Sequence, residues 1–347
     1  MTINVVVATY HAVVLGCDSL SSIVERAYFP FRGDASPARD AQGQFLRDVE
    51  GNLVIPYKGD QLVNTATNIV GGVQKMFLLH ESHDPENVDC SIAAMTSGLG
   101  TLNGLVIAEI AHRFKKRCAQ NEQNYSTALA VVQEFVEFVR PLWEAHVSFN
   151  ETEENIREWL EDLNFLVAGY GPDDDYIKVF RVSVSNRTTV ETFPDAPHCS
   201  AAWAGQSDSV ASLVNGKSPL IVRQVSKAIV EALAAQRQSI VESVLRQLRE
   251  QGVQVPDPFE AEVQEVIPPT LPWNAGGPEI DWANLPVQSA VDLVSTLVNA
   301  ESGIQKFSMG IPMVGGRTRI GLMRRGVPFA FLNEPNIIHN NVGYDHD

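Results

Sequence analysis

Apolar residues occur along this chain in two kinds of pattern, short β-branched runs and longer segments with helical spacing. The run at 3–18 is dominated by β-branched residues and predicts two short strands joined by a turn near Tyr10–His11. Further strand-like runs lie at 71–79, 90–98, 164–170, 175–184, 188–193, 199–205, 318–326 and 328–332. The chain therefore opens and closes with strands and carries a second block of strands in its middle.

Four segments have apolar residues at helical spacing, namely 101–118, 126–147, 220–250 and 287–301. In the second of them Ser126 is a candidate N-cap, and Pro141 predicts a kink or a break. The resulting order is strands, helices, strands, helices, strands. Two helical layers around two sheets would bury such a pattern, which predicts an α+β fold.

Two stretches depart from this pattern. Residues 19–72 are rich in Gly, Asp and Pro and predict a long excursion with one β-hairpin at 45–57. Residues 253–284 are rich in Pro and Gly and predict a long loop between two helices. The sequence contains no internal repeat.

Composition changes this picture little. The 347 residues are 44% hydrophobic, which is enough for one large domain or two. No apolar run reaches the roughly 18 residues of a membrane helix, and the N-terminus lacks the basic region of a signal peptide. We therefore expect a cytoplasmic protein with no membrane partner.

The charge and the cysteines exclude further classes. A net charge of −16 repels phosphate backbones, so we expect no nucleic-acid partner. The four cysteines are far apart, without a CxxC pair, and the histidines form no HExxH motif. We expect no metal and no cofactor, and we interpret the three aspartates at 173–175 as a solvated turn rather than a cation site.

The N-terminus carries the candidate chemistry. The opening MTINVVVATYHAVVLGCDS resembles the start of a mature proteasome β-subunit, a member of the N-terminal-nucleophile (Ntn) hydrolases. That family begins with a threonine, forms a strand, turns, and returns through an apolar strand to an aspartate. The spacing of sixteen positions from Thr2 to Asp18 matches the family. Lys75 in GGVQKMF resembles its lysine, and Gly98 in AAMTSGLG resembles its glycine turn before the first long helix.

Weaker likenesses follow in the same order at 165–170, 202–214 and 312–323. The resemblance implies a divergent bacterial-type proteasome homologue with the four-layer αββα sandwich of the Ntn hydrolase type. It also implies a single domain over 1–347, with insertions at about 30–70 and 218–284 that have no counterpart in a typical member.

The implied activity is hydrolysis of an amide or peptide bond. A threonine hydroxyl is a poor nucleophile until a base takes its proton. With Met1 removed, the α-amine of Thr2 could be that base, since its ordinary pKa is about 8 against about 10 for a lysine. Lys75 would lower the pKa of this amine, Asp18 would orient the lysine, and the Gly98 N–H would face the oxyanion. Without the resemblance, Thr2 would be a strand residue, Asp18 a turn cap and Lys75 a solvated side chain.

Two departures from the family leave alternatives open. Gly205 is followed by Gln206 where members have an auxiliary serine, with Ser207 one step later. The residues before Gly315 and Gly316 lack the family's aspartate and serine, and Glu301 and Ser302 lie too far upstream to align. The rival hypotheses are a catalytically inactive, ring-forming proteasome-like subunit and an amidase acting on a small molecule.

The resemblance also implies a homo-oligomer, and it leaves an ATPase or unfoldase partner unidentified. The predicted helix at 220–250 supports assembly because it carries more apolar residues than a solvent-exposed surface needs. These are Ile229, Leu233, Ile240, Leu245 and Leu248. This face would pack either on the chain's own sheets or on a neighbouring subunit.

Overall fold

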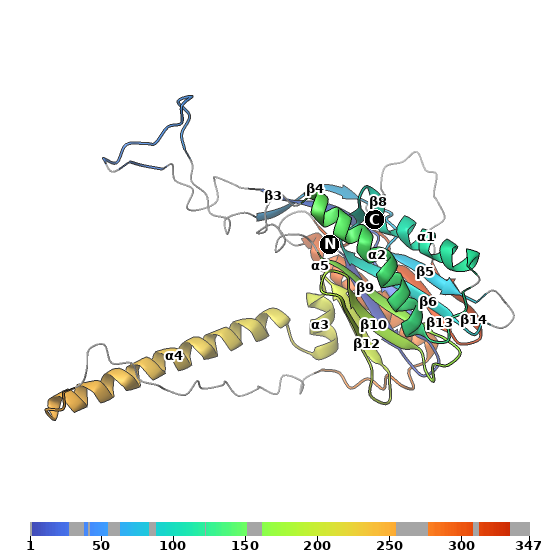
Figure 1. Ribbon diagram of the computed structural model, residues 1–347. Helices are drawn as coiled ribbons and strands as arrows, with labels where there is room; N and C mark the ends of the chain where they lie inside the picture. Colours follow the sequence, from blue (N-terminus) through green and yellow to red (C-terminus); the bar gives the residue numbers. More distant parts are fainter. Residues whose placement is uncertain are drawn as a thin grey trace. The chain divides into compact units, whose positions relative to one another are not determined.

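The structure is a computed structural model that describes residues 2–27, 38–40, 42–54, 63–82, 88–121, 123–150, 162–254, 277–307 and 312–333. It divides into two compact units (Figure 1). The first comprises Met1–Gln206 and Trp282–Asp347, and the second comprises Ser207–Asp281. A single domain over 1–347 stays a prediction.

The first unit contains two five-stranded antiparallel sheets. The first sheet has the order β12-β1-β2-β13-β14. Its strands are β12 (Ser200–Gly205), β1 (Ile3–Ala8), β2 (Val13–Cys17), β13 (Arg319–Arg324) and β14 (Val327–Phe331). The second sheet has the order β11-β10-β9-β6-β5. Its strands are β11 (Thr188–Glu191), β10 (Lys178–Ser183), β9 (Leu163–Tyr170), β6 (Ser91–Gly98) and β5 (Met76–Glu81).

The two sheets share one hydrophobic core, and a second core lies on the far side of the second sheet. The shared core joins Val6 and Leu15 of the first sheet to Met95 and Leu166 of the second. All six residues of β1 are buried, because α5 (Val287–Phe307) packs on the other face of this strand. This explains why residues 5–8 form a continuous apolar run instead of alternating.

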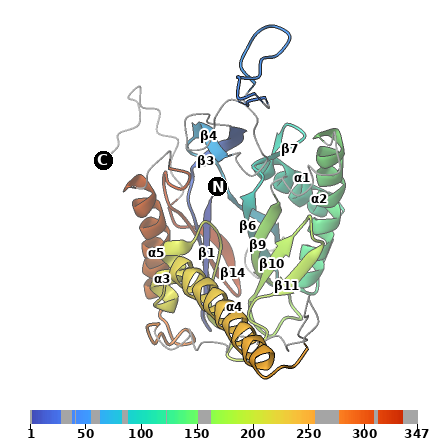
Figure 2. The same cartoon turned by 90° about the vertical axis from the view of Figure 1, so that its left-hand side faces the viewer.

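The second core lies between the second sheet and the helices α1 (Ile107–Gln120) and α2 (Ala128–Asn150). Phe114 and Phe135 meet there edge to face, with ring centroids 5.2 Å apart. The α2 helix continues through Pro141, so the predicted break is absent. Figure 2 shows α5 beside the sheet of β1 and β14, and α1 and α2 beside the sheet of β9 and β10. No helix among the described residues is long and apolar enough to cross a membrane.

The structure also corrects the start of the first predicted helix. The helix predicted at 101–118 begins only at Ile107, because 101–106 form the tight hairpin of β7 (Thr101–Leu102) and β8 (Leu105–Val106). Its turn residues Asn103 and Gly104 both have positive φ, as a two-residue hairpin turn requires.

The excursion at 19–72 contains a strand pair that the sequence prediction missed. β3 (Ser21–Ala27) pairs with β4 (Val63–Val70). In the hairpin predicted at 45–57, the residues up to 54 form only the isolated bridges Arg39↔Phe45 and Arg47↔Leu53. Residues 55–57 of that hairpin, and 255–276 of the predicted loop at 253–284, lie outside the described residues.

The second unit consists of α3 (Asp208–Asn215) and α4 (Pro219–Glu250). Gly216 ends α3 in the left-handed conformation. No residue of α4 is buried. The apolar residues of this helix, which were predicted to pack on the chain's own sheets or on a neighbouring subunit, are therefore exposed or half-buried in this structure.

The α+β class with antiparallel sheets is confirmed. The finer expectation, a four-layer αββα sandwich of the Ntn hydrolase type, is not confirmed by these elements alone.

The contact between β2 and α5 generates a stability prediction. A Cβ added at Gly16 would lie 2.2 Å from Cγ1 of Val294, so Gly16→Ala forces the helix away from the sheet. We expect a loss of about 1–3 kcal/mol in the free energy of unfolding, measured by urea denaturation. The control is Gly303→Ala on the same helix, where a Cβ meets nothing within 4 Å. That substitution should stabilise the protein, and equal effects of the two variants would contradict the packing.

Candidate active site

Three of the predicted site residues lie at the ends of strands, at one end of the two sheets. Thr2 directly precedes β1, Asp18 directly follows β2, and Lys75 directly precedes β5. The β1–β2 hairpin pairs Asn4 with Cys17, which brings the start of β1 beside the end of β2. Asp18 follows β2 of the first sheet, and Lys75 precedes β5 of the second sheet. Their contact therefore also joins the two sheets.

The Asp18 carboxylate is the centre of this cluster and is only 1% exposed. Its Oδ1 accepts hydrogen bonds from Thr2 Oγ1 at 2.6 Å, from Ile3 N at 3.0 Å and from Lys75 Nζ at 2.8 Å. Its Oδ2 accepts from Leu20 N at 3.3 Å and from Gly315 N at 3.1 Å. Burial of a carboxylate is costly without such donors, and here the donors come from four separate parts of the chain.

Lys75 is buried with Asp18 as its counter-ion. Burial lowers the pKa of Lys75, and the charge of Asp18 acts in the opposite direction. The backbone of Lys75 is also fixed, because Thr96 N on β6 donates to Lys75 O at 3.0 Å. The ammonium group is thus held in place from both its side chain and its backbone.

The separation of 57 residues between Asp18 and Lys75 is closed by the β3–β4 pair. Ser21 pairs with Val70, so the chain leaves and returns at the same point. Ser19 O then accepts a hydrogen bond from Val73 N at 2.9 Å, two residues before Lys75. The long excursion is therefore compatible with a compact site.

Gly98 lies at the same end of the sheets, as the last residue of β6. Asn4 Nδ2 donates to Thr96 O at 2.9 Å and ties β6 to β1 two residues before Gly98. The φ of Gly98 is 91°, and a Cβ there would lie 1.7 Å from Asp162 O, so only glycine fits. The role of the Gly98 N–H as an oxyanion donor stays a prediction.

Several residues that the sequence prediction did not assign complete the site. Gly315 N donates to Asp18, and Arg317 N donates to Ser19 Oγ at 2.8 Å. The double glycine at 315–316 is the sequence feature that could have indicated these two backbone donors. Beside Thr2, Gln206 N donates to Thr2 O at 2.8 Å, and Gly205 approaches so closely that a Cβ would lie 2.1 Å from that oxygen. The position after Gly205 therefore contacts Thr2 through its backbone, although it holds Gln206 rather than serine.

The cluster combines a hydroxyl, a carboxylate and an ammonium group within hydrogen-bond distance of one another. It also contains Cys17, whose thiol has its pKa raised to about 12, chiefly by burial and then by the charge of Asp18. Cys17 is therefore a neutral thiol and not a competing nucleophile. Among the groups named here, the Thr2 hydroxyl is the one suited to attack on a carbonyl carbon.

The buried ion pair generates a second prediction. Lys75→Met removes the cation and leaves the Asp18 carboxylate buried without it, which should cost about 3–5 kcal/mol of folding free energy. In the double variant with Asp18→Asn the remaining carboxylate charge is gone, so the combined loss should be clearly smaller than the sum of the single losses. Urea denaturation of all four proteins measures this coupling.

The control for this cycle is the exposed pair of Arg187 and Glu144, whose side chains are 67% and 48% exposed. The same cycle there should give no measurable coupling, because solvent screens the two charges. Additive effects of Lys75→Met and Asp18→Asn would contradict the ion pair.

No protein-family model matches the chain, and no curated protein matches it. Similar solved structures are Anbu proteins. The Gly-1 mutant of Anbu from Hyphomicrobium sp. strain MC1 is 9% identical with a TM-score of 0.44, over 96% of this chain and 87% of that chain. Anbu from Yersinia bercovieri, described as an ancestral beta-subunit, is 12% identical with a TM-score of 0.40, over 93% and 81%. A second Hyphomicrobium Anbu structure is 9% identical with a TM-score of 0.39, over 95% and 87%.

These findings correct the family assignment. The chain was expected to be a divergent bacterial-type proteasome homologue of the proteasome β-subunit-like Ntn hydrolase family, and that was wrong. The reason is that the resemblance depended on a short N-terminal motif and several weaker likenesses along the chain, whereas identity to the similar structures is 9–12%. What remains is a distant likeness to Anbu proteins, which at these TM-scores carries no argument about fold or activity.

Proposed function

We propose that the chain hydrolyses amide or peptide bonds with Thr2 as the nucleophile. The observation that supports this most directly is the shared carboxylate. Asp18 Oδ1 accepts hydrogen bonds from both the Thr2 hydroxyl and the Lys75 ammonium group, and all three side chains are buried. A hydroxyl held beside a fixed cation is suited to acyl transfer, since the cation stabilises negative charge that develops on nearby oxygens.

The proposed reaction proceeds in two halves. Thr2 Oγ attacks the carbonyl carbon while its proton passes to the α-amine of Thr2. The C–N bond then breaks, the departing amine takes that proton, and the acyl group remains on Thr2 as an ester. Water attacks the ester in the second half, which releases a carboxylic acid and restores the hydroxyl. Gly98 N–H is the proposed donor to the oxyanion in both halves.

This mechanism requires one change of conformation and one covalent change. The hydroxyl donates to Asp18 in the structure, so the proton must first be redirected to the amine by rotation of the Thr2 side chain. Thr2 must also carry a free α-amine, which requires removal of everything that precedes it. Both requirements can be tested directly.

An αββα layer order is part of the same proposal. The contacts of α1 and α2 with the second sheet, and of α5 with the first, support it. In this arrangement the site residues lie where the inner sheets end, with strands rather than mobile loops holding each side chain. A cytoplasmic location also stays a prediction.

The activity prediction compares Thr2→Ala with Thr2→Ser in a protein produced with residue 2 as its first residue. Thr2→Ala removes the nucleophile and should lower the rate at least about 1,000-fold on fluorogenic peptide amides. Thr2→Ser keeps a hydroxyl and an α-amine and should retain part of the rate. Intact mass should show one molecule of a threonine-directed electrophile on the wild type and none on Thr2→Ala.

Thr188→Ala is the matched control, because Thr188 is exposed on β11. It should leave both the rate and the labelling unchanged. Full activity of Thr2→Ala would place the active site elsewhere in the chain.

A second candidate function is a non-catalytic, assembly-forming subunit. Two observations favour it. The Thr2 residue is only 4% exposed and its hydroxyl already satisfies Asp18, which is a sufficient structural reason for a threonine there. In addition, α4 presents apolar side chains to solvent, among them Val230 and Ile240 at 52% and 57% exposure. Such a surface is typical of a contact between copies of a chain.

The assembly prediction is measured by light scattering at micromolar concentration. Wild type should have a mass that is a multiple of 38.1 kDa. Ile240→Glu should lower that mass, because it introduces a charge into the apolar surface, whereas Gln238→Glu on the same helix should not. A mass of one chain for wild type would contradict a homo-oligomer and leave the hydrolase proposal untouched.

A further inference from the structure

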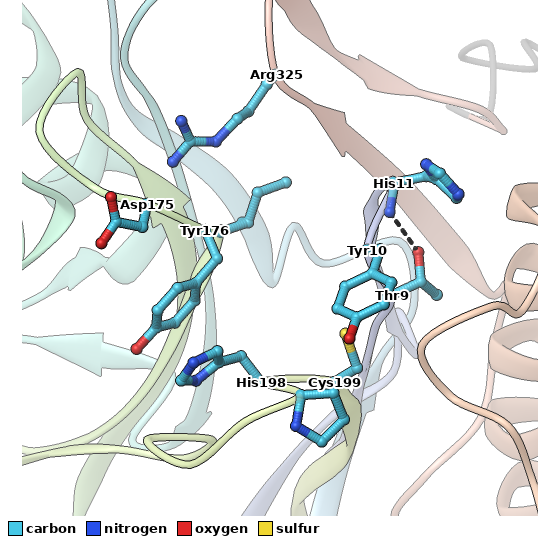
Figure 3. A pocket seen from close by; sticks show the side chains of 10 residues that line it. Thr9, Tyr10, His11, Asp175, Tyr176, His198, Cys199 and Arg325 are labelled. Carbon is cyan, nitrogen blue, oxygen red and sulfur yellow. Dashed lines mark hydrogen bonds between the residues drawn. The ribbon is translucent and has the colours of Figure 1, made fainter.

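A pocket lies at the opposite end of β1 from Thr2. It has a volume of about 440 Å³, which is within the range of small-molecule sites. Every residue that lines it belongs to the first unit, so it does not depend on the placement of the second (Figure 3). They are Thr9, Tyr10, His11, Asp175, Tyr176, Ile177, Pro197, His198, Cys199 and Arg325.

One wall of the pocket is the turn between β1 and β2. Thr9 Oγ1 accepts hydrogen bonds from His11 N at 3.2 Å and from Ala12 N at 3.1 Å, which fixes this turn from inside. The turn presents Tyr10 outward, with 62% of the residue exposed. Since an exposed tyrosine ring loses few rotamers on binding, it offers an apolar surface at low entropic cost.

The opposite wall is a pair of stacked rings. Tyr176 and His198 are parallel to within 10°, with centroids 3.7 Å apart. The Tyr176 hydroxyl donates to Glu191 at 2.7 Å, and the Nδ1 of His198 lies 3.0 Å from Phe193 O. His198 also has a φ of 58°, the left-handed conformation that few residues other than glycine adopt. The rings are therefore held in place before any ligand arrives.

The pocket contains an arginine in a chain that is acidic overall. Among the lining residues Arg325 and Asp175 carry formal charges of opposite sign, and His11 and His198 contribute imidazole rings. The chain as a whole has 42 acidic residues and 26 lysines and arginines. Figure 3 shows the Arg325 guanidinium above Tyr176 and near Asp175. One of its nitrogens donates to Asp174 O, and its carbon lies 5.3 Å from the Tyr170 ring centroid, so the group is oriented.

We propose that this pocket binds a small planar aromatic anion. The ring of the ligand packs between Tyr10 and the Tyr176–His198 pair, and its carboxylate or phosphate pairs with the Arg325 guanidinium. Such a ligand would contact both the aromatic walls and the Arg325 guanidinium, whereas a neutral ring would contact only the walls and a bare anion only the guanidinium. The proposal does not depend on the activity of Thr2.

Two anionic probes distinguish the two classes of ligand that combine an aromatic ring with a negative charge. Adenosine monophosphate represents a nucleotide, and benzoate represents an aromatic carboxylate. Adenosine and benzamide are their neutral counterparts, and inorganic phosphate is the anion without a ring. Saturation-transfer NMR and isothermal titration on the full chain should show binding of at least one anionic probe, at least 10-fold tighter than its neutral counterpart and than phosphate.

Variants then assign the binding to this pocket. Arg325→Gln should lower the affinity for the anionic probe at least 10-fold and leave the affinity for its neutral counterpart unchanged. Tyr10→Ala should lower the affinity for both. Arg113→Gln is the matched control, because Arg113 is an exposed arginine that pairs with Glu109 on α1, and it should change neither affinity. Circular dichroism checks that each variant folds.

Three results would overturn the proposal. They are the absence of binding by both anionic probes at millimolar concentration, equal affinity for an anion and its neutral counterpart, and equal losses for Arg325→Gln and Arg113→Gln. Because Tyr10 is exposed in a turn, Tyr10→Ala keeps the test valid if Arg325→Gln fails to fold.

Discussion

The need to satisfy one buried carboxylate, that of Asp18, determines the geometry at one end of the first unit. Burying a carboxylate that is 1% exposed costs free energy unless hydrogen-bond donors surround it. The donors come from the start of β1, the residue before β5, the segment after β2 and the loop at Gly315. Because β1 and β5 belong to different sheets, the same carboxylate also fixes how the sheets meet at this end. A site that a substrate could use and a structural anchor are therefore built from the same bonds.

This dual role explains why geometry alone supports two candidate functions. A hydroxyl that donates to Asp18 stabilises the fold whether or not it ever attacks a carbonyl carbon. Catalysis would add a free α-amine on Thr2, access for substrate and an oxyanion donor. The arrangement of Asp18 and Lys75 would be the same in both cases, so substitutions of these two residues would lower stability whether or not the chain is a hydrolase. Thr2→Ser is more informative, since it keeps the hydroxyl that Asp18 needs.

Local sequence predicted one half of this site and not the other. In the β1–β2 hairpin the numbers of paired residues add to 21, as for Asn4 with Cys17 and Ala8 with Val13. A turn near Tyr10–His11 therefore places Asp18 opposite Ile3 and next to Thr2, which the β-branched run at 3–18 was enough to predict. Lys75 is different, because its approach depends on the pairing of Ser21 with Val70 across a long excursion. That pairing is a tertiary contact with no local periodicity to reveal it, and the excursion was predicted without these strands. The contribution of Gly315, 297 residues from Asp18, lies equally beyond local pattern.

The two ends of β1 are far enough apart to act separately. Thr9 lies seven positions after Thr2, and at about 3.3 Å per residue an extended strand of this length spans roughly 23 Å. This distance exceeds the Debye length of about 8 Å at physiological ionic strength, so an anion beside Arg325 changes the potential at Lys75 very little through solvent. Any coupling between the pocket and the Thr2 site would have to pass through a shift of β1 itself. All six residues of that strand are buried, between α5 and the second sheet, and a closely packed strand resists such a shift. The proposed chemistry at Thr2 and the proposed binding of an aromatic anion at Tyr10 would thus be independent of each other.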